Sequence, residues 1–155
     1  MWNIAQVNIA RMAAPNIDDP IMLEFVQNLD RINAVADQSP GFVWRLKEEK
    51  GNATSIQFNE DRRIIVNLSV WRSLDDLMLF VYKSNHREVM MKRKQWFEQM
   101  KFFMALWYIP KFSFPSLEDA RFRLEHLEKN GTSPIAFTFA KQFSPQEYES
   151  VLKSM

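Results

Sequence analysis

Cysteine is absent from the chain, and its absence excludes several kinds of chemistry together. A protein without thiols has no disulfide, no thiolate nucleophile and no sulfur-ligated metal or cluster. Histidine is nearly as scarce: the 155 residues include two, and neither has a second histidine at ligand spacing. A dedicated zinc site is therefore not expected.

Glycine, net charge and long hydrophobic runs are also scarce. Three glycines argue against a loop-rich fold, while a content of 46% hydrophobic residues can build the core of one domain. A net charge of +1 provides no electrostatic footprint for nucleic acid. No apolar run approaches the roughly 20 residues that a membrane span needs, and residues 1–12 lack the pattern of a signal peptide. We expect a cytoplasmic protein without a nucleic-acid or membrane partner.

Motifs for several common reactions are missing as well. The chain contains no glycine-rich phosphate loop, nucleophile elbow, HExxH motif or paired-carboxylate signature. Nucleotide hydrolysis, serine-type hydrolysis and zinc proteolysis are therefore not expected.

Alternating and apolar segments predict the strands. The clearest are residues 3–11, 42–46, 63–71 and 102–109. Two further segments are weaker: residues 53–58 as a short strand and residues 135–140 as an extended edge.

Capping residues and apolar stripes predict the helices. One helix follows Asp19-Pro20 and runs from residue 21 to about residue 37; another opens at Leu74 after Ser73. A third covers residues 82–100, with a bend or restart near Ser84-Asn85. Further helices follow Ser116, up to Lys129, and Ser144-Pro145 near the C-terminus.

The order strand, helix, strand, strand, helix, strand predicts an α+β, ferredoxin-like βαββαβ antiparallel sheet with its helices on one face. The alternation places a set of mostly polar residues together on the other, uncovered face. Two such faces could meet in a homodimer and form a dimeric α/β barrel with a partly polar interior, or the face could line a ligand cavity. The set is Gln6, Asn8, Asn67, Ser69 and Trp71.

His86 and Arg93 fall on the apolar side of the predicted 82–100 helix. A group that can carry positive charge on a buried face needs a partner: a carboxylate, a backbone carbonyl or a ligand. Arg93 could bind a carboxylate or phenolate, or pair with an acidic residue such as Asp30. His86 could be a general base, a ligand or a hydrogen-bonded core residue.

Four segments resemble the uncharacterised DUF3291 family: NIARMAAPNIDDPIM (8–22), FVQNLDRINAVADQSPGFVWRLK (25–47), IIVNLSVW (64–71) and YKSNHREVMMKRKQWFEQM (82–100). The resemblance runs from about Asn3 to Phe139. It implies a domain of the dimeric α/β-barrel superfamily over residues 1–139, followed by a C-terminal extension over 140–155. That superfamily includes cofactor-free mono-oxygenases acting on quinol-like substrates, and also haem enzymes.

The amides of Asn8 and Asn67 could donate hydrogen bonds to a substrate oxygen or a developing oxyanion, or pair across a dimer interface. The indoles of Trp44, Trp71 and Trp96 could line an aromatic pocket, or simply fill the core. We therefore assign a catalytic set of His86, Arg93 and Asn67, and a substrate-binding set of Asn8, Trp71, Trp44 and Trp96.

The leading hypothesis is a homodimer that binds a small aromatic or polyene-like molecule, with no cofactor and no metal. If it is an enzyme, mono-oxygenase-like or isomerase-like chemistry fits best. One alternative is a haem enzyme with His86 as axial ligand. Another is a non-enzymatic dimeric assembly module.

Overall fold

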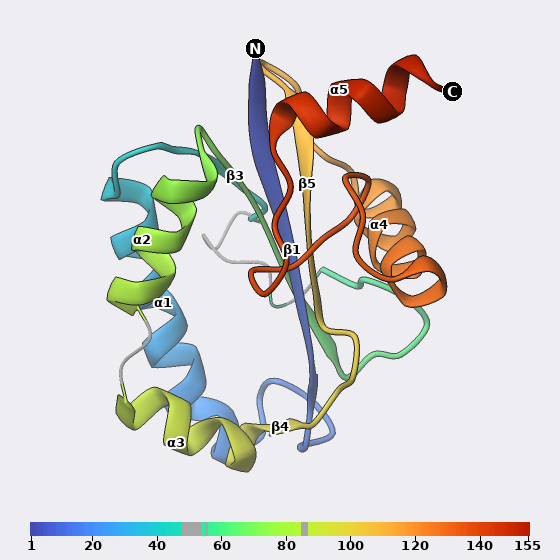
Figure 1. Ribbon diagram of the computed structural model, residues 1–155. Coiled ribbons are helices and arrows are strands. Elements are labelled where there is room, and N and C mark those ends of the chain that lie inside the picture. Colours follow the sequence, from blue (N-terminus) through green and yellow to red (C-terminus); the bar gives the residue numbers. More distant parts are fainter. Residues whose placement is uncertain (48–53, 55, 85–86) are drawn as a thin grey trace.

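The computed structural model describes residues 1–47, 54, 56–84 and 87–155 (Figure 1). An antiparallel sheet of five strands stands at its centre. The strands are β1 (Trp2–Met12), β2 (Phe42–Arg45), β3 (Ile64–Trp71), β4 (Phe97–Glu98) and β5 (Met104–Pro110).

The long strand β1 organises the sheet. It pairs with β3 along one edge, and β3 pairs in turn with β2. Along its other edge β1 pairs first with β5 and then, at residues Arg11 and Met12, with β4. With β1 and β3 in the middle and β2 and β5 outside, this is the ferredoxin-like arrangement predicted from the order of elements.

The helices begin where capping residues predict. Asp19 accepts a hydrogen bond from the backbone of Ile21 at 3.1 Å and opens a short 3₁₀ turn, η1 (Pro20–Met22), which leads into α1 (Leu23–Gln38). The others are α2 (Leu74–Ser84), α3 (Arg87–Trp96), α4 (Leu117–Asn130) and α5 (Pro145–Lys153). None of these helices, within the residues described, is both long enough and apolar enough to cross a bilayer.

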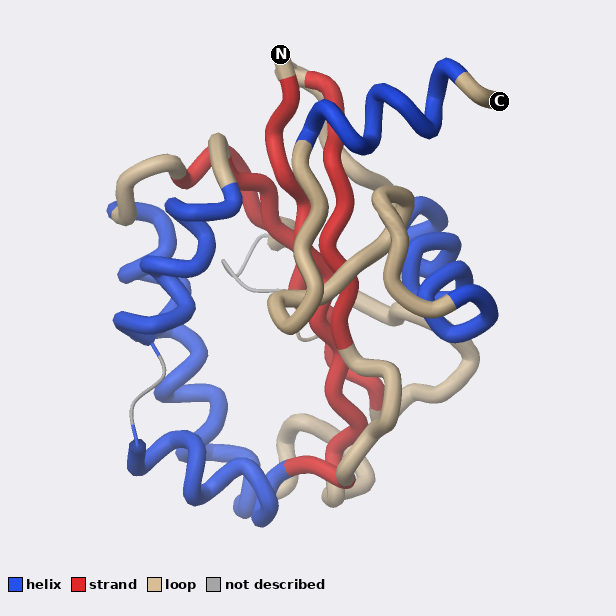
Figure 2. Tube along the Cα trace, in the orientation of Figure 1, coloured by secondary structure: helices blue, strands red, loops and turns tan. Residues whose placement is uncertain are grey.

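Helices lie on both sides of the sheet, with α1, α2 and α3 on one side and α4 on the other (Figures 1 and 2). The inner face of α4 packs on the apolar face of the strands, where Ala5, Val7 and Val66 are buried. Ala36 of α1 and Leu77 of α2 pack on the opposite face, against residues that include Ile4 and Trp71. Both faces are therefore covered within one chain.

This arrangement corrects the prediction that the polar strand face is uncovered. That face lies under α1, α2 and α3, and the apolar face predicted to carry those helices is closed by α4 instead. Alternation along a strand shows which residues share a face. It does not show which face receives a given helix, because both faces here carry large apolar side chains.

Two element boundaries also differ from the prediction. In the 82–100 segment, α2 ends at Ser84 and α3 begins at Arg87, as the predicted restart near Ser84-Asn85 requires. The helix ends earlier than predicted, at Trp96, and the chain then turns into β4. The reason is pairing, since Phe97 and Glu98 join the end of β1. Residues 56–58 are not a strand, and most of the remainder of the predicted 53–58 strand lies outside the described residues.

The C-terminal segment returns to the sheet and packs along β5. Phe137 and Leu106 exchange backbone hydrogen bonds of 2.8 and 2.9 Å, in the segment predicted to be extended. Tyr108 donates a hydrogen bond of 2.5 Å to the carbonyl of Phe143. Tyr148 of α5 is buried against Trp2, with ring centroids 5.2 Å apart. Three buried residues, Ala136, Phe137 and Tyr148, thus anchor the segment 135–153 to the core.

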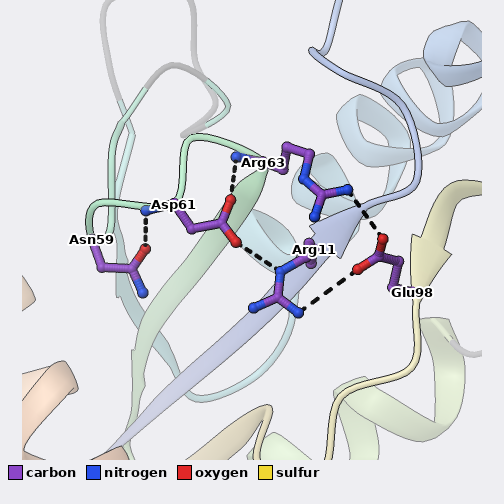
Figure 3. A network of polar contacts seen from close by, with 5 residues as sticks. All are labelled: Arg11, Asn59, Asp61, Arg63 and Glu98. Carbon is purple, nitrogen blue, oxygen red and sulfur yellow. Dashed lines mark hydrogen bonds and ion pairs between the residues drawn. The ribbon is translucent and has the colours of Figure 1, made fainter.

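Ion pairs fasten β4 to the rest of the sheet (Figure 3). Arg11 bonds Asp61 at 2.7 Å and approaches Glu98 at 3.7 Å, and Arg63 also bonds Glu98 at 3.0 Å. Hydrogen bonds from Arg11, and then from the backbone of Arg63, lower the pKa of the Asp61 carboxyl below its usual range. The network fixes the end of α3, because β4 follows that helix directly.

Candidate ligand-binding cleft

A cleft lies between the polar face of the sheet and helices α1, α2 and α3. It has two adjoining lobes, with volumes of about 660 Å³ and about 200 Å³. The lobes meet at residues that line both of them: Asn8, Ile32, Asn33, Arg45, Asn67 and Arg93. The larger lobe alone falls within the range of about 300–1,000 Å³ that is typical of small-molecule sites.

The floor of the cleft is a ladder of uncharged polar side chains. Asn8 of β1 lies directly opposite Asn67 of β3, and Gln6 lies opposite Ser69 one step along the same face. Directly opposed side chains of an antiparallel pair have their Cβ atoms about 5 Å apart. The sheet register therefore brings these four residues together, although Asn8 and Asn67 are 59 positions apart in sequence.

The amides around this floor have no hydrogen-bond partner. Among the residues that the structure describes, no side-chain hydrogen bond involves Gln6, Asn8, Asn33 or Asn67. Gln6 and Asn33 are each only 8% exposed and both line the larger lobe. Their amide atoms are not among the described side-chain atoms that are sealed without a partner, so they open onto the cleft rather than into the core. Their free donors and acceptors are available to a ligand.

Aromatic rings form one wall of the larger lobe. Trp71 is completely buried; its ring stacks on Phe80 of α2 at 4.9 Å with an interplanar angle of 24°. Phe42 meets the same indole edge-on at 5.4 Å. The indole N–H donates to Ser69 Oγ at 3.0 Å, which satisfies the indole and leaves the hydroxyl hydrogen free for another acceptor.

Positive charge lines the place where the lobes meet. Arg93 is half-buried there and makes no ion pair within the described part of the chain; the suggested partner Asp30 is exposed on α1. The side chain of Arg45 is only 12% exposed and bonds Asp37 at 2.8 Å. Neither lobe is lined by an aspartate or glutamate among the described residues.

The structure separates the predicted indoles. Trp71 lines the larger lobe, and Trp96, which is 2% exposed, lines the smaller one beside Phe25, with ring centroids 5.7 Å apart. Trp44 does not line the cleft. It packs in the cluster on the α4 side of the sheet, 5.5 Å from Phe114, because the register of β2 shifts between Phe42 and Trp44.

His86 lies outside the described residues, so its assignment stays a prediction. The described lining of the cleft contains no imidazole or phenolate that could ligate a haem iron, and does not fit a haem by itself. No group of three or more metal-ligating side chains occurs among the residues that the structure describes.

A family profile described as "Domain of unknown function (DUF3291)" matches residues 3–153. The chain belongs to this family. The DUF3291 match extends beyond Phe139, the C-terminal end of the resemblance described above, and includes α5. No curated protein matches the chain.

Solved structures similar to this DUF3291 protein include SnoaB, described as a cofactor-independent oxygenase from Streptomyces nogalater. An asparagine-to-alanine variant of SnoaB is 16% identical, with 74% of this chain and 98% of that chain covered and a TM-score of 0.47. The unsubstituted protein gives 18% identity, 75% and 100% coverage, and a TM-score of 0.43. The protein YJCS gives 9% identity, 70% and 97% coverage, and a TM-score of 0.39.

The DUF3291 cleft also contains residues that sequence reasoning did not assign to it. Asn33 is the clearest, and a signal for it exists: it interrupts the apolar stripe of α1, four residues after Leu29. A buried amide within such a stripe indicates a polar contact. Phe80 and Phe139 gave no such signal, because apolar residues of this kind are expected in any core.

Proposed function

We propose that the protein binds a small, partly aromatic organic molecule in the cleft between the sheet and helices α1 to α3. One observation supports this above all: a cavity of about 660 Å³ has unpartnered amides on its floor and a buried aromatic wall beside them. Apolar walls with a few convergent polar groups are characteristic of small-molecule sites. In a protein that binds no ligand at this place, we would expect the side chains to fill the cavity or to form hydrogen bonds with these amides.

The lining also favours a class of chemistry. Asn8, Asn67 and Arg93 are hydrogen-bond donors, and donors fixed in advance stabilise negative charge that develops on a substrate oxygen. Two reaction types develop such charge without a cofactor. One is isomerisation of a carbonyl compound through its enolate. The other is mono-oxygenation by dioxygen of an activated CH2 group that first loses a proton, in which one oxygen atom becomes the new carbonyl and the other leaves as water with the two hydrogens. We propose one of these as the reaction class, with His86 as the proton acceptor and without haem.

We also propose a homodimer, but one whose two sheets do not pack face to face as the sequence suggested. Because α4 covers one sheet face and α1 to α3 cover the other, a second copy would dock outside the sheet faces. The alternative of a pure assembly module requires the polar face to be filled by a partner. The cleft and its cover from the same chain favour ligand binding instead.

Binding can be tested with two naphthalene probes, 2-naphthoate and 2-naphthalenemethanol, by isothermal titration calorimetry. We expect saturable binding of at least one probe. Ala36→Phe should abolish it, because Ala36 is 7% exposed and lines the larger lobe. Ala34→Phe is the matched control: the same change on the same helix, at an exposed position.

Two results would contradict the proposal: no saturable binding of either probe, or binding that survives Ala36→Phe in a folded variant. If Ala36→Phe fails to fold, Ile32→Trp places a comparable ring at a position that lines both lobes. Light scattering on the same samples measures the oligomeric state.

A further inference from the structure

We infer that the ligand of the cleft is an aromatic acid, with its anionic oxygen held by Arg93 where the lobes meet and its ring beside the phenyl groups of the larger lobe, Phe42, Phe80 and Phe139. This inference rests on the proposed function and names the substrate class of the same site. It follows from the charge, the spare donors and the shape of the described lining.

The charge of the lining has one sign. Arg45, Arg93 and Lys101 line the larger lobe, whereas no described acidic residue lines either lobe. Arg45 is largely neutralised by Asp37, which it contacts at 2.8 Å through Nε and at 3.2 Å through a terminal nitrogen. Among the side chains that the structure describes, Arg93 has no such counter-ion. A half-buried guanidinium facing a cavity without a carboxylate favours an anionic occupant.

Neutral donors stand beside that guanidinium. Asn8, Asn33 and Asn67 line both lobes together with Arg93, so all four groups surround the same region of space. Carboxylate and phenolate oxygens accept several hydrogen bonds, and a set of one cation and spare amide N–H groups can satisfy them. A hydrocarbon without a polar group would leave these amides unpaired.

The type of anion follows from the position of Arg93. It lies in the last turn of α3, where the carbonyl ends of the helix carry partial negative charge. Such a location favours a singly charged carboxylate or phenolate over a doubly charged phosphate. The chain also lacks the glycine-rich loop with which backbone amides commonly bind phosphate.

The rest of the larger lobe fits a flat apolar group. Phe42 and Phe80, which pack on the buried indole of Trp71, form one side, and Phe139 from the C-terminal segment lines the same lobe. A ring system placed here extends from the charged junction towards the aromatic wall. The ligand therefore has an anionic oxygen at one end and an aromatic body at the other.

The test compares probes that differ in charge but hardly in shape. We expect 2-naphthoate to bind about tenfold or more tightly than 2-naphthalenemethanol, the usual range for a hydrogen bond to a charged group. Arg93→Gln should remove this preference and leave the affinity for the alcohol nearly unchanged. Lys94→Gln removes the same charge from the exposed neighbouring position and should preserve the preference. Titration of 2-naphthol below and above its ionisation distinguishes a phenolate from a carboxylate site.

Equal affinity for the acid and the alcohol in the unmodified protein would overturn the inference and leave the proposed function standing. A preference that persists in folded Arg93→Gln would overturn the role of Arg93. Should that variant not fold, Arg93→Lys keeps the charge but not the planar fork of donors, and should retain only part of the preference. Absence of binding by every probe would overturn both proposals.

Discussion

Asn8 and Asn67 lie directly opposite each other in the β1–β3 pair, and both line the two lobes of the cleft. The two amides have no hydrogen-bond partner among the described residues, and neither do Gln6 and Asn33 nearby. Asn67 is exposed and Asn8 is partly exposed, so these amides open onto the cleft, where a ligand could pair them.

A substitution at Asn33 should raise the free energy of unfolding and at the same time weaken ligand binding. Asn33→Leu replaces an unpartnered, 8% exposed amide on α1 with an apolar side chain of similar size. We expect the variant to be more stable, by about 1 kcal/mol, because no protein hydrogen bond is lost and apolar area is buried. We also expect weaker binding of 2-naphthoate. Urea unfolding and calorimetry measure the two quantities. A loss of stability in Asn33→Leu would show that the amide is paired in the native protein.

Trp71 should contribute strongly to stability through its ring. Trp71→Phe keeps an aromatic ring beside Phe80 but removes the larger indole from a position with no exposure, which should cost about 2 kcal/mol in urea unfolding. Trp96→Phe, at the other end of the cleft, is the matched control. Binding of naphthalene probes should fall in Trp71→Phe, because the indole supports the rings of Phe42 and Phe80 in the larger lobe. Binding should change less in Trp96→Phe, because Trp96 lines the smaller lobe. Equal losses in both variants would contradict the placement of the ring.

Gly41 should tolerate alanine much less well than Gly131. Both have positive φ, +82° and +74°, so alanine is strained at each by about 1 kcal/mol. At Gly41 a Cβ atom would also lie 2.2 Å from the Asp76 carboxylate, whereas nothing lies within 4 Å at Gly131. Gly41→Ala should therefore lower Tm clearly more than Gly131→Ala. Because the Cβ atom of Asp76 itself would lie 2.5 Å away, Asp76→Gly rather than Asp76→Ala should recover part of the excess in a double-mutant cycle. A lack of recovery would mean that backbone strain dominates.

Tyr108 should hold the C-terminal segment to the sheet in a pH-dependent way. Burial, and then the charge of Glu147, raise the pKa of Tyr108 above its ordinary value. A raised pKa in the folded state means that the neutral phenol stabilises the fold fully below the ordinary tyrosine pKa, and that this contribution disappears as pH rises through the folded pKa. Tyr108→Phe removes the hydrogen bond to Phe143 and should increase hydrogen exchange in residues 143–153.

The pH profile provides the control for this role of Tyr108. The stability difference between the wild-type protein and Tyr108→Phe should be constant near neutral pH and decrease above the ordinary tyrosine pKa. A difference that does not change at high pH would mean that ring packing, rather than the hydrogen bond, holds the segment.

Acid should release the ion pairs that fasten β4. The pKa of Asp61 is lowered, chiefly by the hydrogen bond from Arg11, so its contribution is present above the ordinary carboxyl pKa and lost as pH falls through the folded value. Asp61→Asn should lower Tm at neutral pH, and the difference from wild type should close in acid. Added salt should also reduce it, since these charges are partly exposed. A pH-independent difference would assign the effect to the turn at Asn59 rather than to charge.

The sequence by itself determined the elements, because their signals are local. Alternation located β1 and β3, capping residues located the starts of α1, α4 and α5, and the order of these elements gave the ferredoxin-like sheet. It also placed Asn8, Asn67 and Trp71 on one face of the sheet, since side chains alternate strictly along a strand.

Only the tertiary structure decided what covers that face. A strand pattern states that two faces exist, but the packing of distant helices determines that α1 to α3 enclose the polar one and α4 closes the other. For the same reason the structure places Trp44 outside the predicted site, while Asn33 and Phe80 line the cleft although the sequence did not assign them to it. A cleft is formed by residues from several elements, and the distances between those elements are set by the packing of the whole chain rather than by any segment of it.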